Sequence, residues 1–233
     1  MSEISSGVIE SRQTPAPSNR YLARAGGIHT VALSTLLTVL GAIWLAMLLS
    51  HAGTVDHALF SKIYDFAGGR LLRYAWWTTF LGSPEFLYSA LAIAAVIGVA
   101  QLHRTHGVIL WIAVTLTCRL MVTLEKWVFA LPRPHPSFHH VTVHSYAFPS
   151  GHSANSMATY LSFALIMVAA RWRPWALAVA LAVSFAVGLS RIILGVHWPS
   201  DVMGGWAFGA FWAVGGVWVA DRFRRVPRYQ AAE

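Results

Sequence analysis

The sequence predicts an all-α integral membrane protein with six transmembrane helices and both termini in the cytoplasm. Composition is the first observation, because 56% of the 233 residues are hydrophobic and 11% are charged, whereas a soluble domain carries about 25% charged residues. A mean hydropathy of +0.55 is the second, and it comes from apolar runs that recur along most of the chain. The third is the distribution of lysine and arginine, which assigns the predicted loops to the two sides of a membrane.

Six apolar runs are long enough to cross a bilayer, which requires about 20 mostly apolar residues. They cover residues 30–50, 86–102, 107–129, 152–170, 175–195 and 199–220. A cleavable signal peptide is not expected, because the first run begins near residue 30 and has the length of a full span.

Lysine and arginine are more frequent on one side of these spans. If the N-terminus is cytoplasmic, ten basic residues fall inside: Arg12, Arg20, Arg24, Arg104, Arg171, Arg173, Arg222, Arg224, Arg225 and Arg228. Six fall outside: Lys62, Arg70, Arg73, Lys126, Arg133 and Arg191. This excess follows the positive-inside rule and predicts that both termini are cytoplasmic. It also accounts for the net charge of +8 without a nucleic-acid partner.

The segments around the spans define the predicted domain organisation. Residues 1–28 are rich in Ser, Pro and Gly and are expected to form a mobile cytoplasmic tail. Residues 29–221 are expected to form one six-helix membrane domain, and residues 222–233 a basic cytoplasmic C-terminal tail. The single cysteine, Cys118, lies in an apolar run and permits no disulfide framework.

The outside stretch 52–85 predicts a short amphipathic helix in the membrane interface after the first span. Its apolar residues recur at helical spacing: Val55, Leu59, Ile63 and Phe66. Further along, in "GSPE", Ser83 suits an N-cap and Pro84 the first position of the next helix.

The third span ends in "EKWVFALPRPHP", which places Lys126 and Arg133 near the membrane edge. Seven residues are nearly two helical turns, so both side chains would share one face of a continued helix. Pro132 and Pro134 are expected to break the helix and let Arg133 turn back over the same region. The alternative is that both cations snorkel to the interface as ordinary anchors.

The fourth span opens with "FPSGHSAN". Ser150 and Gly151 belong to a tight turn, and the helix is expected to begin near His152. The free N–H groups and positive dipole end of a helix N-terminus suit a bound phosphate, and glycine lets the backbone approach it closely. The alternative is a serine cap followed by an interfacial histidine.

The fifth span runs into "SRIILGVHWPSD". Ser190 and Arg191 lie in its last turns, and His197 lies in the connection. Pro199 suits the first position of the sixth helix, which puts Asp201 in a first turn that favours a carboxylate. A carboxylate four residues from a histidine can reach its ring N–H and fix the tautomer. The alternative is a capping aspartate beside an unrelated histidine.

All of these polar residues fall at one face of the predicted membrane. Three cations, two histidines, a hydroxyl and a carboxylate make an anion site with acid–base and nucleophilic capacity. They are Lys126, Arg133, Ser150, His152, Arg191, His197 and Asp201. Ionisable groups at a membrane edge are functional candidates by default.

The order and spacing of these residues resemble the three-part motif of the type 2 phosphatidic acid phosphatase superfamily. The resemblance is to its bacterial membrane branch, which includes undecaprenyl-diphosphate and phosphatidylglycerophosphate phosphatases. The matching residues are Lys126, six residues, Arg133 and Pro134; then Pro149, Ser150, Gly151 and His152; then Ser190, Arg191, five residues, His197, three residues and Asp201. No motif position departs from the family pattern.

This resemblance implies metal-independent hydrolysis of a lipid phosphate ester through a phosphohistidine, with no cofactor. It makes His197 the nucleophile, oriented by Asp201, and His152 the acid that protonates the leaving oxygen and later activates water. The groups implied to hold the phosphoryl oxygens are Lys126, Arg133, Ser150, Arg191 and the backbone of Gly151, with Ser190 in support. The implied location is a bacterial inner membrane, with the site facing the periplasm.

The implied substrate is a lipid whose phosphate lies at headgroup depth while its tail stays in the bilayer. Undecaprenyl diphosphate, phosphatidylglycerophosphate, phosphatidic acid and lipid A phosphates all fit this motif set. Residues 52–85 and 135–148 are expected to select among them, but they carry no readable code.

Three other functions are compatible with some of these residues: a metal enzyme, a transporter and a phosphotransferase. The loop "HPSFHHVTVH" carries four histidines that could bind a transition metal, although no carboxylate or cysteine accompanies them. They are His135, His139, His140 and His144. Arg119 and Glu125, inside the third span, could line a transport pathway. A phosphohistidine could also pass its phosphate to another lipid, which would make the protein a phosphotransferase.

Overall fold

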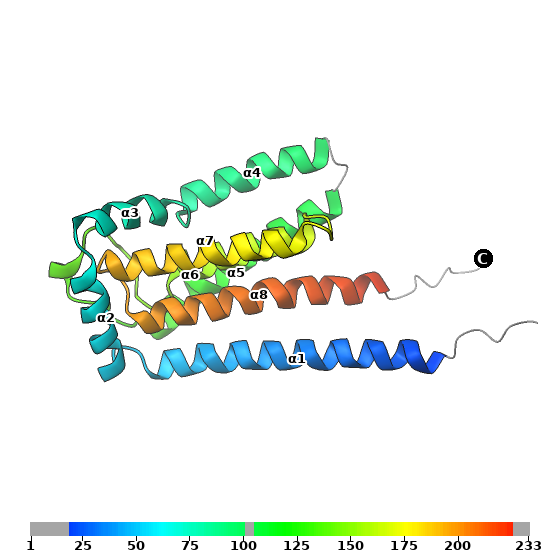
Figure 1. The fold of residues 1–233 in the computed structure, drawn as a ribbon, viewed down its shortest axis with the longest axis horizontal. Coiled ribbons are helices and arrows are strands. Elements are labelled where there is room, and N and C mark those ends of the chain that lie inside the picture. Colours follow the sequence, from blue (N-terminus) through cyan, green and yellow to red (C-terminus); the bar gives the residue numbers. More distant parts are fainter. Residues whose placement is uncertain (1–18, 101–104, 226–233) are drawn as a thin grey trace, which may run out of the picture. The chain divides into compact units, whose positions relative to one another are not determined.

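The structure, a computed structural model, describes residues 19–100 and 105–225 (Figure 1). The regular elements in these two ranges are all helical, which confirms the predicted all-α class for this part of the chain. They are α1 (Asn19–Leu49), α2 (Thr54–Phe66), α3 (Gly69–Phe80), α4 (Pro84–Ala100), α5 (Thr105–Phe129), the 3-10 helix η1 (Pro136–Phe138), α6 (Gly151–Ile166), α7 (Arg173–Ile193) and α8 (Pro199–Arg225).

The chain divides into two compact units, Met1–Leu36 and Leu37–Glu233. In the first unit the described part is the beginning of α1, where the hydroxyls of Ser34 and Thr35 donate to the Val31 carbonyl. The second unit contains the rest of α1, the other helices and every residue of the candidate site.

Four helices have the length and hydropathy of a membrane span: α1 from Thr30 to Leu49, α5, α7 and α8 up to Arg222. A fifth candidate is the pair α3 and α4, which passes the same test together and is bent by 44° at the break. α6 has only 16 residues and carries several serines, which shortens and polarises its apolar run. The described residues therefore form a multi-pass membrane protein with four or five candidate spans, where six were predicted.

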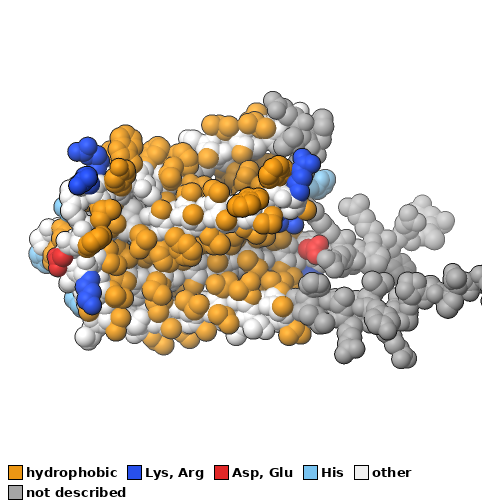
Figure 2. Space-filling view, viewed as in Figure 1, with side chains coloured by type: hydrophobic (Ala, Val, Ile, Leu, Met, Phe, Trp, Pro, Cys, Tyr) orange, Lys and Arg blue, Asp and Glu red, His pale blue; other side chains and the backbone are white. Residues whose placement is uncertain are grey.

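Hydrophobic side chains cover the visible surface of these helices, and charged side chains gather towards the helix ends (Figure 2). On α4, Ile93 and Val96 are 62% and 67% exposed, and Val179 on α7 is 62% exposed. Burying apolar surface drives the folding of a protein in water, whereas such exposed helix faces suit contact with lipid.

The stretch 52–85 forms two helices where one was predicted. α2 occupies the predicted residues, packs against α7 and α8, and crosses their ends (Figure 1). It buries Asp56 and Phe60, whereas Val55 and Phe66 are 70% and 79% exposed. Leu59 is also exposed, whereas Ile63 packs against the buried cluster around Phe60. Three of the four residues of the predicted apolar face thus lie on the exposed side of α2.

The second helix of this stretch, α3, was not predicted because arginines interrupt its apolar residues. α3 packs against α7. This tertiary contact stabilises the helix, although its own sequence has no continuous apolar run. The following helix, α4, begins as predicted at Pro84, and the hydroxyl of Ser83 accepts the N–H of Phe86 at 3.2 Å.

α6 packs against α5, α7 and α8. α8 approaches it through glycines: a Cβ added at Gly209 would lie 2.3 Å from the carbonyl oxygen of Ala154. This close contact sets the start of α6 beside the start of α8, where the Ser150 N–H donates to the Asp201 carbonyl at 2.9 Å. The second and third sequence motifs are joined by this bond.

The predicted tails fall mostly outside the described residues, which begin at residue 19 and end at residue 225. Helix α1 begins at Asn19 and α8 continues to Arg225. Both helices therefore extend into the ranges 1–28 and 222–233 that were expected to be tails.

Candidate active site

Four helix ends meet where the three sequence motifs come together. α5 and α7 end there, and α6 and α8 begin there. Hydrogen bonds and electrostatic interactions link the predicted residues into one cluster: Lys126, Arg133, Ser150, Gly151, His152, Arg191, His197 and Asp201. The sequence prediction that these residues share one site agrees with this arrangement.

His197 is held between a carboxylate and a guanidinium. Its Nδ1 lies 3.1 Å from Asp201 Oδ2, and its Nε2 lies 3.0 Å from Arg133 Nη1. Because an arginine only donates hydrogen bonds, Nε2 must accept here, and the ring proton is on Nδ1, donated to Asp201. The ring is therefore fixed in the tautomer that leaves a lone pair on Nε2.

Asp201 also caps its own helix, because Oδ2 accepts the Trp198 N–H at 2.9 Å. The two sequence interpretations of Asp201, helix cap and histidine partner, are thus both realised. The carboxylate is fully buried, so its two bonds to His197 and Trp198 replace part of its hydration.

Arg133 turns back over the site, as predicted. The chain is redirected after α5 at Ala130, which has a positive φ of 47°. The guanidinium donates to the carbonyl of Ser145 at 2.7 Å and to that of Val196 at 2.6 Å. Burial lowers the pKa of Arg133 to about 10, which leaves it charged at neutral pH.

Lys126 is also turned into the protein rather than outward as an anchor. Its Nζ donates to the carbonyls of Tyr146 at 2.6 Å and Ala147 at 3.1 Å. These bonds tie the end of α5 to the loop that leads into α6. The cation is thereby held next to Gly151, whose added Cβ would lie 3.7 Å from Lys126 Cε.

Ser150 is the N-cap residue of α6, but its hydroxyl makes no capping hydrogen bond. Its Oγ is buried and has no partner among the described residues. The first N–H groups of a helix also lack partners within the helix. A buried hydroxyl beside such N–H groups suits an anion better than the simple serine cap considered from the sequence.

Arg191 and Ser190 are neighbours with different surroundings. Arg191 is 5% exposed, its Nη1 donates to Thr79 Oγ1 at 2.7 Å, and its Nε has no partner in the described part of the chain. The Ser190 hydroxyl donates to the Val187 carbonyl of its own helix at 2.6 Å. Arg191 therefore keeps a donor available for a ligand, whereas Ser190 stabilises the end of α7.

The pKa of His197 is well below its usual value near 6.5. Burial is the main cause, because a charged imidazole would lose its hydration. The positive charges of Arg133, Lys126 and Arg191 and the His152 ring act in the same direction. His197 is therefore neutral at pH 7, with an unprotonated Nε2 whose lone pair accepts from Arg133.

Three residues of this region were missed from the sequence. His51, between α1 and α2, places Nε2 3.3 Å from Asp201 Oδ1. Asp56 accepts the Ser200 N–H at 2.8 Å and also binds the Ser200 hydroxyl. Thr79 accepts from Arg191, as described above. Asp56 and Ser200 are 144 positions apart, so no local spacing could have revealed them.

The histidines of the 135–144 loop do not gather at one point. His139 Nε2 lies 3.0 Å from the Pro134 carbonyl, His140 Nε2 lies 3.0 Å from the Tyr64 hydroxyl, and His135 contacts Ser137. Across residues 19–100 and 105–225, no three His, Cys, Asp or Glu side chains form a group that could hold a metal ion.

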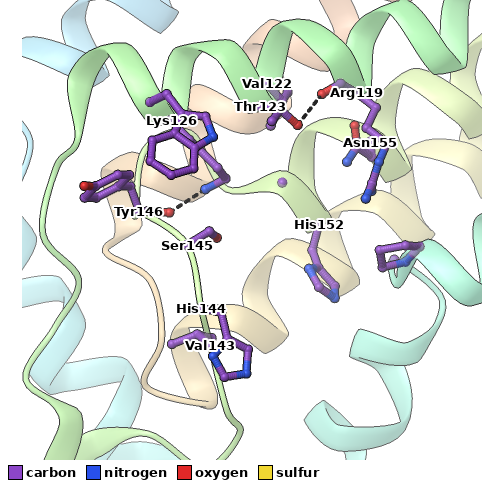
Figure 3. A pocket seen from close by; sticks show the side chains of 14 residues that line it. Arg119, Val122, Thr123, Lys126, Val143, His144, Ser145, Tyr146, His152 and Asn155 are labelled. Atoms are coloured by element: carbon purple, nitrogen blue, oxygen red, sulfur yellow. Dashed lines mark hydrogen bonds between the residues drawn. The ribbon is translucent and has the colours of Figure 1, made fainter.

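A cavity of about 690 Å³ opens beside the phosphate-binding candidates (Figure 3). It lies between the start of α4, the last turns of α5, the 143–146 loop and the start of α6. Its wall includes Lys126, Gly151, His152, Arg119 and Asn155. His152 points into this space, where it can reach a group bound there.

The sequence of this chain is similar to those of known membrane phosphatases. The sequence model of the PAP2 superfamily matches residues 105–225. Phosphatidylglycerophosphatase B of Bacillus subtilis is 32% identical over 56% of this chain and 66% of its own length. Lipid A 1-phosphatase of Rhizobium johnstonii is 34% identical over 41% of this chain and 40% of its own length. These two alignments thus span less than two thirds of each relative.

Similarity to solved structures covers more of the chain. The crystal structure of a PAP2-type phosphatidylglycerolphosphate phosphatase from Bacillus subtilis superimposes with a TM-score of 0.73 and 23% identity, over 82% of this chain and 98% of that one. LpxE of Aquifex aeolicus gives a TM-score of 0.55 and 18% identity, over 72% of this chain and 97% of that one. At these identities the likeness concerns the fold.

Proposed function

The chain belongs to the PAP2 superfamily, and from this premise we propose that it is a membrane lipid phosphatase that works through a phosphohistidine and without a metal ion. The observation that carries the proposal is the His197 ring, held on one nitrogen by Asp201 and on the other by Arg133. A neutral imidazole with a fixed tautomer, surrounded by cations, is suited to attack a phosphoryl group.

In the first step, His197 Nε2 attacks phosphorus while the bond from phosphorus to the lipid oxygen breaks. His152 gives its proton to that leaving oxygen, so the lipid departs as an alcohol or as a shortened phosphate. Asp201 accepts the Nδ1–H bond and stabilises the positive ring of the phosphohistidine. Arg133, already in contact with Nε2, transfers its donor to a phosphoryl oxygen as the N–P bond forms.

In the second step, water attacks the phosphohistidine. His152, now neutral, takes a proton from the water, the new O–P bond forms, and the N–P bond breaks to release inorganic phosphate. The negative charge on the equatorial oxygens is neutralised throughout by Lys126, Arg133 and Arg191, and the Ser150 hydroxyl and Gly151 N–H donate to the same oxygens. In this proposal Lys126, Arg133 and Arg191 supply the positive charge that a divalent ion supplies in many other phosphatases.

The proposed topology has six crossings: α1, α4, α5, α6, α7 and α8. The site lies at the ends of α1, α5 and α7 and at the starts of α4, α6 and α8, as alternating crossings require. The excess of lysine and arginine that the sequence assigns to the opposite side supports cytoplasmic termini and an outward-facing site. For a bacterial inner membrane this is the periplasmic face.

The proposed substrate class follows from this position, because a phosphate at headgroup depth reaches His197 while its tail stays in lipid. Relatives with 34% and 28% identity carry the names lipid A 1-phosphatase and undecaprenyl-diphosphatase, the second from Sulfolobus acidocaldarius and aligned over 61% of this chain and 71% of its own length. Together with phosphatidylglycerophosphate and phosphatidic acid, these lipids form the set to be tested.

The test is phosphate release by purified protein in detergent from each of these lipids, with and without EDTA. We expect release from at least one lipid, unchanged by EDTA and absent in His197→Ala. Loss of activity in EDTA that is restored by a metal would overturn the metal-independent mechanism. Because no gradient exists in detergent, turnover there also excludes a purely transporting protein.

The same assay separates hydrolysis from phosphotransfer. Candidate acceptor lipids are added, and free phosphate is compared with newly phosphorylated lipid. Hydrolysis predicts phosphate as the only phosphorylated product besides the remaining substrate. Accumulation of a phosphorylated acceptor would make the protein a phosphotransferase with the same histidine chemistry.

A further inference from the structure

His51 is a buried histidine that the proposed mechanism does not use. It follows the last residues of α1, and its side chain is only 5% exposed. Its Nε2 lies 3.3 Å from Oδ1 of Asp201, the carboxylate that holds the nucleophile His197. The two atoms are within ion-pair distance, and neither forms an aligned hydrogen bond with a described residue. Buried polar atoms are normally paired, so this contact is a candidate for a function.

Asp201 has one carboxylate oxygen that is paired and one that faces His51. Oδ2 accepts the His197 Nδ1–H at 3.1 Å and the Trp198 N–H at 2.9 Å. The donor that the described residues offer to Oδ1 is His51. A buried carboxylate loses its hydration, so each further donor helps to keep it ionised. Because an ionised carboxylate only accepts hydrogen bonds, His51 can bind it only with a proton on Nε2.

Asp56 fixes the chain so that His51 lies beside this carboxylate. Ala52, the residue after His51, has a positive φ of 52°, which turns the chain sharply between α1 and α2. The Ala52 N–H donates to Asp56 Oδ2 at 2.8 Å, and Asp56 Oδ1 accepts the Ser200 N–H at 2.8 Å. One buried side chain therefore joins the residue after His51 to the residue before Asp201.

The His51 ring is also in contact with a buried aromatic ring. It meets Phe148 edge-on, with the ring centres 6.4 Å apart at an angle of 90°, and Phe148 is fully buried. His51 is not among the described residues that line the cavity beside His152. Its position therefore suits a group that acts on Asp201 rather than one that binds the substrate.

We propose that His51 is a positioning residue that donates its Nε2–H to Asp201 Oδ1 and acts on the reaction through that carboxylate. This inference rests on the proposed function, because it requires His197 as the nucleophile. As the N–P bond forms, the His197 ring becomes positive, and Asp201 must stay ionised to stabilise it. A second donor stabilises the ionised carboxylate, so the proton stays on His197 Nδ1. Catalytic hydrogen bonds are often poorly aligned before the substrate binds and tighten in the complex.

The test compares substitutions that differ in whether a donor reaches Asp201. His51→Phe keeps an aromatic ring beside Phe148 but removes the N–H. In His51→Gln the side-chain amide can occupy the position of Nε2, whereas the shorter amide of His51→Asn cannot reach that far. In detergent, kcat and KM are measured on the lipid that the wild-type protein hydrolyses best, together with the thermal unfolding temperature. His140→Gln is the matched control, because His140 contacts Tyr64 outside the site.

We expect kcat to fall about tenfold to a hundredfold in His51→Phe and His51→Asn, as for the loss of a hydrogen bond to a charged group. KM should change by less than about threefold, because His51 does not line the cavity. His51→Gln should keep kcat within about threefold of the wild-type value, because its amide replaces the donor. His140→Gln should keep full activity.

A second comparison shows whether His51 acts through Asp201. In an Asp201→Asn background, adding His51→Phe should lower the residual kcat by less than about threefold, because the carboxylate that His51 stabilises is already gone. Independent effects would instead multiply. The full His51→Phe loss in that background would overturn the proposal.

Equal kcat values in His51→Gln and His51→Asn would also overturn the proposal, because only the longer amide can donate to Oδ1. These two polar variants carry the test if His51→Phe does not fold. Parallel losses of kcat and of unfolding temperature in all three variants would make His51 a structural residue. The absence of phosphate release by the wild-type protein would instead refute the proposed function itself.

Discussion

The two sides of the candidate active site differ in how many of their polar groups are already paired. On the nucleophile side, His197, Asp201 and Arg133 are joined to one another and to backbone groups by hydrogen bonds of 2.6 to 3.1 Å. On the cavity side, Asn155 Oδ1 is buried without a described partner, and Arg119 has only an aromatic ring beneath it. Between the two sides, at the start of α6, Ser150 Oγ is also buried without a described partner.

This difference separates preorganisation from binding. Groups that are fixed during folding need not reorganise when charge develops on the phosphoryl group. Such preorganised groups stabilise the transition state most effectively. Groups left unpaired in the folded protein lower its stability, and they regain hydrogen bonds when a ligand binds. Substitutions on the nucleophile side should therefore reduce both kcat and the free energy of unfolding. Substitutions of the unpaired groups should reduce kcat/KM without lowering the free energy of unfolding.

The largest expected effect comes from His197→Ala, which removes the proposed nucleophile. Turnover should fall by about 10⁵-fold or to the detection limit, and no labelled phosphoenzyme should be trapped from a labelled lipid by rapid acid quench. His140→Gln is the matched control, because His140 contacts Tyr64 outside the site; it should keep full activity. Substantial turnover by His197→Ala would contradict the phosphohistidine mechanism.

Asp201→Asn tests whether the nucleophile side needs a carboxylate or only a hydrogen-bonding group. The amide keeps the shape but releases the fixed tautomer and the charge that stabilises the phosphohistidine, so kcat should fall by about 10³-fold. Asp56→Asn is the comparison, since Asp56 binds Ser200 without touching His197. It should lower the thermal unfolding temperature but reduce kcat by less than about tenfold. Similar losses of kcat in both variants would contradict the proposal that the Asp201 carboxylate orients and stabilises His197.

Ser150→Ala tests the unpaired hydroxyl at the start of α6. Removing one donor to the phosphate should lower kcat/KM by about tenfold, while the unfolding temperature stays the same or rises because a buried unpaired hydroxyl is gone. Ser162→Ala in the same helix is the control, because the Ser162 hydroxyl is buried and donates to the Ala158 carbonyl. It should lose stability and keep activity. The reverse pattern would mean that Ser150 is only structural.

The smallest expected effect is a pH dependence of stability that comes from His197. Its pKa is well below 6.5 in the folded protein and near 6.5 in an unfolded chain. Between these two values the unfolded state binds a proton that the folded state does not, so stability falls as the pH drops below about 6.5. Unfolding temperatures from pH 7.5 to pH 5 should drop less in His197→Asn, which cannot titrate. Identical slopes in both proteins would contradict the burial of a neutral His197.

Much of the candidate site could be predicted because each motif combines local rules. The four-residue spacing of His197 and Asp201 follows from the start of a helix, and the two prolines around Arg133 predict the end of α5, which comes just before them at Phe129. These relations depend on residues within one turn or one loop. Local geometry was sufficient to predict that all three motifs face one end of the helices, because their positions at span ends can be read from hydropathy.

Other parts of the site depend on contacts between distant segments. His51 meets Asp201, Thr79 meets Arg191 and Asp56 meets Ser200 only because α1, α2 and α3 pack where they do. Similarly, α3 is a helix despite its interrupted apolar pattern, because it packs against α7. The number of spans is also sensitive to tertiary structure, since α6 is short and polar and lies against three other helices.

The sequence by itself determined the helical class, the membrane setting, the three motifs and the identities of the charged residues. Those properties follow from composition and from spacings of a few residues, which fix the local chain geometry. The tertiary structure alone decided which polar groups are paired and which are left open, because pairing depends on distances between helices. In the tertiary structure the His197 ring is held by hydrogen bonds on both nitrogens. On the cavity wall, by contrast, Asn155 Oδ1 has no described partner and Arg119 contacts only the Tyr88 ring.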